Sequence, residues 1–154
     1  MTPMRALLLS ALIALALPVQ KVDVFGYYMF DGKAPAGFTD IDHLHLSTID
    51  EKNGEMVTVP LYGFIRMKAR MQGKNKAMAV DHHLVDLKLD GKKLAFATKP
   101  DGGVSYRFAG TFSKLGNFPK EPPQGVILQG HLVKMQGEKK AAEADVRFVY
   151  EAGG

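Results

Sequence analysis

Residues 104–112 read Val-Ser-Tyr-Arg-Phe-Ala-Gly-Thr-Phe, an alternation of apolar and polar side chains that is broken only near its end. Successive side chains of a β-strand point to opposite faces, so this alternation predicts a strand with one buried and one solvated face. The buried face would carry four apolar residues: Val104, Tyr106, Phe108 and Phe112. The turn signal Pro100-Asp101-Gly102-Gly103 precedes the strand, and the proline-containing segment 113–124 follows it.

The same period of two continues on both sides of this segment, with turn signals between the runs. The predicted strands cover residues 22–30, 41–49, 56–67, 78–89, 94–98, 104–112, 126–135 and 146–150. Asn53-Gly54 and Asp90-Gly91 are typical hairpin turns because Asn, Asp and Gly tolerate positive φ. Pro60 predicts an edge position or a bulge, since proline cannot donate to the ladder. Residues 138–144 are expected to connect the last two strands, with room for one helical turn.

About eight strands with mostly short connections predict an all-β, antiparallel fold. Such a sheet must close on itself or pack on a second sheet to bury its apolar face. Long strands joined by hairpins favour a small up-and-down (lipocalin-like) barrel. The alternative is a β-sandwich, which is less favoured because it needs longer crossovers. Segment 113–124 is the one place where such a crossover would fit.

The first residues predict an address outside the cytoplasm. Arg5 precedes the apolar run 6–17, and Ala14-Leu15-Ala16 supplies the small residues of a cleavage site, so residues 1–16 are expected to be a signal peptide. The run is shorter than the about 20 residues that a membrane span needs. Residues 17–154 then form a single domain without a membrane span. The absence of cysteine is typical of a periplasmic rather than a disulfide-dense secreted protein, and the location is expected to be periplasmic or secreted.

The charge of the chain argues against nucleic-acid binding. The 20 Lys and Arg residues outnumber the 16 Asp and Glu residues only slightly, for a net charge of +4. Many lysines fall in predicted turns instead of clustering on one strand face between aromatic residues, as a nucleic-acid surface would require. We therefore expect no nucleic acid among the partners.

Aromatic residues indicate a site for a small ligand. A barrel mouth can hold an apolar or lipid-like molecule among aromatic side chains with a few oriented polar groups. The candidate ligand-binding residues are Tyr27, Tyr62, Tyr106 and Phe108. The same residues are also good strand formers and could pack the core.

Histidines provide the alternative, a metal site. His43 and His45 lie two apart on a predicted strand, so both imidazoles project from one face, about 7 Å apart at Cα. Asp40 and Asp42 would face the other way unless a bulge intervenes. His82, the neighbouring His83, or His131 would supply a third ligand. The metal set is thus His43, His45 and His82, and the cofactor is unknown, with a divalent metal possible.

Gly37, followed after five residues by His43-Leu44-His45, resembles the opening of the first cupin motif. The resemblance implies a double-stranded β-helix with a metal on the two histidines. It covers about nine residues. Where that family expects a glutamate, this chain has Ile49 and Asp50, and the second motif of the family is absent.

Catalytic motifs are missing from the sequence: it contains no cysteine, no G-x-S-x-G and no H-E-x-x-H. We therefore expect a non-catalytic binding protein for a small apolar or lipid-like ligand, although enzyme activity is not excluded. The alternatives are a metal-binding barrel using His43 and His45, and an envelope module that binds a protein partner through an exposed strand edge.

Overall fold

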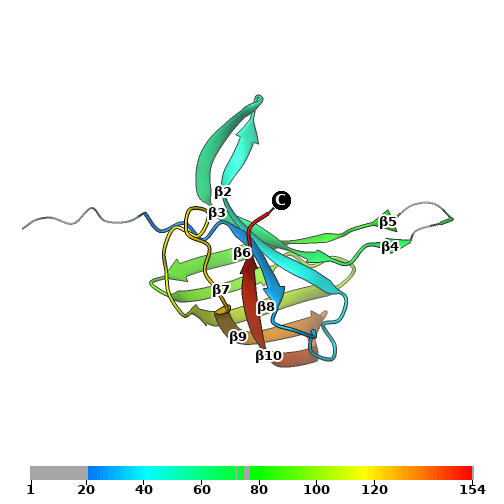
Figure 1. Ribbon diagram of the computed structural model, residues 1–154. Coiled ribbons are helices and arrows are strands. Elements are labelled where there is room, and N and C mark those ends of the chain that lie inside the picture. The colour runs from blue at the N-terminus through cyan, green and yellow to red at the C-terminus, as the bar shows by residue number, and fades with distance from the viewer. Residues whose placement is uncertain (1–20, 72, 75–76, 154) are drawn as a thin grey trace, which may run out of the picture.

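The structure is a computed structural model that describes residues 21–71, 73–74 and 77–153 (Figure 1). Eight antiparallel strands form a closed barrel in the order β1-β10-β9-β8-β7-β6-β3-β2. Their bounds are β1 Gly26–Phe30, β2 Ile41–Lys52, β3 Glu55–Met67, β6 Asp81–Asp90, β7 Lys93–Thr98, β8 Val104–Phe112, β9 Val126–Gln136 and β10 Lys139–Glu151. Two further short strands, β4 Arg70–Met71 and β5 Ala77–Met78, pair with each other. The predicted all-β, up-and-down barrel is therefore confirmed, and its meander order is not that of a double-stranded β-helix.

The inside of the barrel is filled largely by aromatic rings. Phe96 and Phe108 stack with ring centroids 5.2 Å apart, and Phe148 packs edge-on against Phe108 at 6.1 Å. Gly110 and Gly130 face each other on β8 and β9 beneath the Phe108 ring. A Cβ at Gly130 would come within 2.7 Å of that ring, so the glycine lets Phe108 lie across the sheet. Burial of these rings is the main source of stability for a barrel that has no cysteines.

One end of the barrel is closed by the segment that the sequence marked as a crossover. Phe118, in the segment between β8 and β9, is almost fully buried and packs against Phe112 and Tyr150. Its backbone N–H donates to Asp23, which in turn donates to Gly116. The segment is thus a plug between two neighbouring antiparallel strands rather than a crossover between sheets. Because β8 runs from Val104 to Phe112, the Val104 end of the barrel lies opposite this plug.

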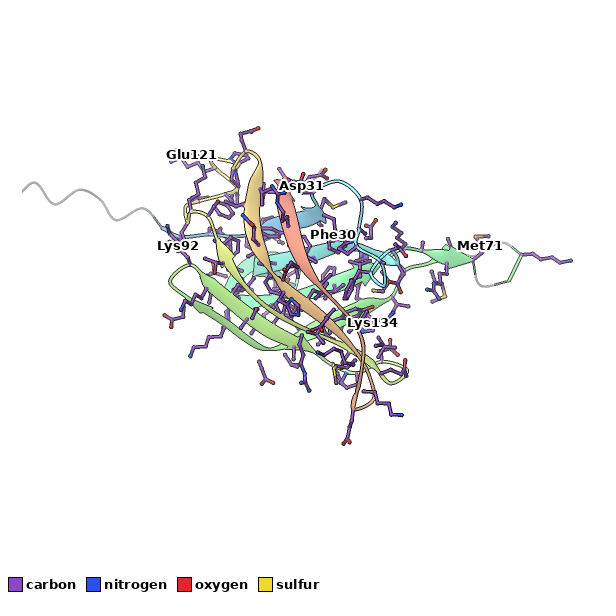
Figure 2. All side chains as sticks on the ribbon, turned by 90° about the horizontal axis from the view of Figure 1, so that it is seen from below. Phe30, Asp31, Met71, Lys92, Glu121 and Lys134 are labelled. Carbon is purple, nitrogen blue, oxygen red and sulfur yellow. The ribbon has the colours of Figure 1, made fainter. Side chains whose placement is uncertain are left out.

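Two arms project from the barrel (Figure 1). The distal part of the β2–β3 hairpin rises above it, and β3 pairs with β6 only over Phe64–Arg66. Pro60 therefore lies where β3 has no partner on its β6 side within the described residues, as the edge prediction requires. The β4–β5 arm extends from the Met67 end of β3, and the view with side chains shows Met71 and Lys134 toward one end of the molecule and Lys92 and Glu121 toward the other (Figure 2).

The last connector differs from the prediction. Strand β10 begins at Lys139 and not at Val146, so residues 139–144 are strand and not a helical turn. Gly137 adopts φ +58°, which closes a tight turn, and a bulge between Lys140 and Ala142 continues the ladder. Ala142 and Ala144 then pack against the core.

The predicted signal peptide, residues 1–16, lies outside the described residues, so its cleavage and the location of the protein stay predictions. The described part of the chain contains no helix that is long and apolar enough to cross a membrane.

Candidate functional site

The open end of the barrel holds a pocket of about 400 Å³. It lies between the Met67 end of β3, the Asp81 end of β6, the β4–β5 arm, the Val104 end of β8 and the segment that precedes β8. Its lining residues are Asp40, Met67, Lys68, Arg70, Met78, Val80, His82, Asp101, Val104, Tyr106 and Lys134. We call this hollow the mouth pocket. It lies opposite the end plugged by Phe118, because Val104 begins β8 and Phe112, at the other end of β8, packs against Phe118.

Two buried polar side chains form the floor of the mouth pocket. His82 and Tyr106 pack edge to face, with ring centroids 5.2 Å apart and exposures of 6% and 0%. The Tyr106 hydroxyl and His82 Nδ1 are both shielded from solvent and have no hydrogen-bond partner in the described structure. Burial raises the pKa of the Tyr106 hydroxyl, and the nearby Asp40 carboxylate raises it further, so the group is a neutral donor. Two of the residues that line the cavity therefore each hold a buried polar atom without a partner in the described structure.

The rim of the mouth pocket is charged. The Asp40 carboxylate lies 3.6 Å from Arg70 and 3.9 Å from Lys134, so it is shared between two cations. Lys68 and Asp101 complete the charged lining, and the rim carries three cations against two carboxylates. The side walls between rim and floor are apolar, with Met67, Met78, Val80 and Val104. The pocket thus combines a small positive excess, an apolar wall and a polar floor.

The other two buried histidines, His43 and His45, lie on the outer face of the sheet formed by β1, β2, β3 and β6. Tyr27 of β1, His45 of β2, Phe64 of β3 and His83 of β6 are successive partners in the ladder. Their side chains share the outer face, because Tyr28, Leu44, Ile65 and His82 point inward. The Tyr27 ring lies 4.6 Å from the His45 ring and 5.1 Å from the His43 ring, and Phe64 lies 4.9 Å from His45. Aromatic rings on the neighbouring strands therefore bury both imidazoles to about 8% exposure.

His43 is oriented by a carboxylate. A register shift between Ile41 and His43 places Asp42 in a bulge, and the His43 Nδ1–H donates to Asp42 Oδ2 at 2.7 Å. The sequence predicts that Asp42 faces away from the histidines unless a bulge intervenes, and this bulge is what brings Asp42 to His43. The remaining ring nitrogen, His43 Nε2, is buried without a partner in the described residues, and so is His45 Nδ1. Burial lowers the pKa of His45 first, and the nearby His43 lowers it further, which favours a neutral ring.

The candidate ligand-binding residues do not meet at one place. Tyr106 lies on the floor of the mouth pocket, whereas Phe108 is buried in the core. Tyr27 lies on the outer wall, and Tyr62 is 37% exposed on the projecting hairpin, where its hydroxyl donates to Ile49. The aromatic site expected inside the barrel is therefore split, and of the four candidates Tyr106 alone lines the mouth pocket.

The candidate metal residues are split in the same way. His43 and His45 share the outer face as predicted, but His82 faces the barrel interior. His131 lies on β9, where its two ring nitrogens contact Asp145 and Glu143. Across residues 21–71, 73–74 and 77–153, no three His, Cys, Asp or Glu side chains are grouped to hold a metal ion. The set of His43, His45 and His82 is therefore not assembled around one point.

A second hollow of about 430 Å³ opens where β3 separates from β6. It is lined mainly by aliphatic side chains: Val22, Val24, Thr48, Pro60, Leu61, Leu87 and Leu89. None of the buried polar atoms that lack a partner in the described structure belongs to these residues. This hollow can accommodate an apolar group, but it offers few polar groups that would orient a ligand.

Sequence reasoning missed most of the mouth pocket. Several lining residues come from separate strands or strand ends, and in the sequence each resembles an ordinary strand residue. They are Met67, Met78, Val80 and Lys134. One usable signal exists: His82 follows Val80 and Met78 at spacing two, so these three share a face that carries a polar group among apolar ones.

The chain matches no protein-family model, no curated protein and no solved structure. Its function is therefore inferred from the geometry of the mouth pocket.

Proposed function

We propose that this chain is a binding protein that holds a small amphipathic organic molecule in the mouth pocket, without transforming it. The observation that carries the proposal is the floor of the pocket, where two lining residues, Tyr106 and His82, hold a buried hydroxyl and a buried Nδ1 that have no partner in the described structure. The expected address, periplasmic or secreted, remains part of this proposal.

The floor is energetically expensive without a ligand. Leaving a buried donor or acceptor unsatisfied costs about 1–3 kcal/mol, because the group has lost water and gained nothing. A ligand that places an acceptor on the Tyr106 hydroxyl and a hydrogen-bonding group on His82 removes this cost. Sites for small molecules commonly combine an apolar wall with a few such convergent polar groups.

The walls and the rim restrict the ligand further. Met67, Met78, Val80 and Val104 favour an apolar portion, and the methionine side chains can adapt to its shape. The excess of cations on the rim favours an anionic or strongly polar group at the outer end of the ligand. The pocket, at about 400 Å³, fits a molecule of modest size and not a whole lipid. This refines the expectation of an apolar or lipid-like ligand toward an amphipathic one.

The test compares the mass of the purified chain under native and denaturing conditions. A mass excess that exists only under native conditions reports a retained ligand. Val80→Trp fills the mouth pocket and should remove the excess. Val85→Trp is the matched control, because Val85 lies on the same stretch of chain, is equally exposed at 39%, and does not line the mouth pocket.

The hydroxyl itself is tested by Tyr106→Phe, which keeps the ring and deletes one donor. We expect the affinity for the retained molecule to fall about fivefold to tenfold, the worth of one hydrogen bond to a buried group. Tyr150→Phe is the control, since the Tyr150 hydroxyl donates to the Phe25 carbonyl away from the pocket. Loss of the mass excess in Val85→Trp as much as in Val80→Trp would contradict the proposed site.

A further inference from the structure

The β4–β5 arm combines positive charge with exposed apolar side chains. The stretch 68–80, which contains the arm, holds four Lys and Arg residues and no Asp or Glu. Met71 on β4 is 64% exposed, and Met78 on β5 is 43% exposed. We propose that this arm binds the protein to the surface of a membrane that contains anionic lipids. The inference goes beyond the ligand of the mouth pocket and does not depend on it.

The arm projects far enough from the barrel to reach a flat surface. It extends away from the Met67 end of β3 (Figure 1), and Met71 lies toward one end of the molecule (Figure 2). Lys68, Arg70 and Lys74 are all exposed on or beside it. The Arg70 guanidinium lies 3.6 Å from the Asp40 carboxylate, which is itself shared with Lys134. The arm therefore keeps a positive excess that can attract an anionic surface.

The two faces of the arm have different surroundings. Arg70 and Met78 are partners in the ladder, and both line the mouth pocket. Met71 and Ala77 are the next pair, so their side chains lie on the opposite face, which is exposed and apolar. On a membrane, that face can enter the boundary between headgroups and acyl chains. Lys74, at the turn, can then contact the lipid phosphates.

The projecting β2–β3 hairpin shows that charge, and not exposure alone, sets the arm apart. Met56 on that hairpin is 70% exposed, but residues 50–56 hold three carboxylates and one lysine. An anionic surface would repel this hairpin and attract the arm, so the molecule would bind in one orientation. Segment 68–80 contains no aromatic residue on which a nucleic-acid base could stack, and a lipid surface therefore suits it better.

The first experiment measures sedimentation of the full chain with vesicles. We expect binding to vesicles of equal parts phosphatidylglycerol and phosphatidylcholine, weakened by added salt, and none to phosphatidylcholine alone. Lys74→Gln should weaken binding about fivefold, and Met71→Gln about three- to tenfold. The matched controls on the hairpin, Lys52→Gln and Met56→Gln, should not weaken it. Lys74 and Met71 do not line the mouth pocket, so the mass excess of its ligand should persist in both variants.

A second experiment reports insertion directly. The sequence contains no tryptophan, so Met71→Trp introduces the single indole of the chain. Its fluorescence should shift to the blue on addition of the anionic vesicles, and that of Met56→Trp should not. Absence of binding to the anionic vesicles, or equal binding to both kinds of vesicle, would overturn the inference. Unchanged affinity in Met71→Gln would also overturn it, because the arm would then act through charge alone.

Discussion

The wall formed by β2, β3 and β6 holds buried histidines on both of its faces, in contrasting surroundings. On the inner face, His82 is accompanied by Tyr106, apolar side chains and a cationic rim. On the outer face, His43 and His45 are accompanied by aromatic rings and by the carboxylates of Asp42 and Glu151. Both faces leave imidazole nitrogens free in the described structure, so burial alone does not tell their functions apart. The charge around the rings differs: cations predominate around the hollow beside His82 on the inner face, and carboxylates line the hollow beside His43 on the outer face.

The largest expected difference between the two faces is in packing. Leu46→Ala deletes a fully buried side chain inside the barrel, and we expect it to lower the free energy of unfolding by about 2–5 kcal/mol. His45→Gln, at the adjacent residue on the outer face, should cost clearly less, because it exchanges one polar group for another beneath Tyr27 and Phe64. Urea denaturation followed by circular dichroism measures both. Equal losses would mean that the outer aromatic layer is as much a core as the barrel interior.

A smaller effect separates two buried tyrosines of the barrel. The Tyr28 hydroxyl donates to the Val24 carbonyl at 2.6 Å, so Tyr28→Phe should cost about 0.5–1.5 kcal/mol. The Tyr106 hydroxyl has no such partner in the described part of the chain, so Tyr106→Phe should be neutral or slightly stabilising in the ligand-free protein. Thermal unfolding of the two variants, each after removal of bound ligand, makes the comparison. A clear loss of stability in Tyr106→Phe would show that its hydroxyl is satisfied without a ligand.

The sequence was sufficient for the barrel but not for its sites, and β2 shows why. Residues 104–112 have only one apolar face, so their inward side could be predicted. In β2, by contrast, the consecutive residues His43, Leu44, His45, Leu46 and Ser47 are all buried, because Tyr27 and Phe64 cover the outer face. Alternation therefore cannot tell which side faces the barrel.

Two other features of the sites depend on tertiary structure alone. The bulge that brings Asp42 onto His43 is set by the pairing of β2 with β3 and leaves no signal in the sequence. The mouth pocket collects residues from β3, the β4–β5 arm, β6, β8 and β9, and closure of the barrel decides that these strand ends meet. Local patterns thus predicted elements, and the closure of the sheet determined the sites.

On the outer face, the Arg66–Asp81 pair predicts a modest loss of stability in acid. The hydrogen bonds from Arg66 lower the pKa of Asp81 below its ordinary value of 3.8, so the pair stabilises the fold above that value. This contribution is lost as the pH falls through the lowered pKa. Both side chains are partly exposed, so Asp81→Asn should cost no more than about 1 kcal/mol at neutral pH. Unfolding measured at neutral pH and near pH 3 should show a smaller acid effect in the variant than in the parent chain.

The smallest effect, and of opposite sign, is expected from His131 on β9. Asp145 and then Glu143 accept hydrogen bonds from its ring, and together they raise its pKa above the ordinary value of 6.5. A histidine whose pKa is raised by folding stabilises the fold fully below the unfolded value, and that contribution disappears as the pH rises through the folded value. Melting temperatures of the parent and of His131→Gln should therefore converge as the pH rises from 6.5 through the raised pKa of His131. Because the ring is exposed, added salt should narrow the gap that remains at lower pH. A gap that instead widens with rising pH would mean that the outer face of β9 and β10 holds His131 as a neutral ring.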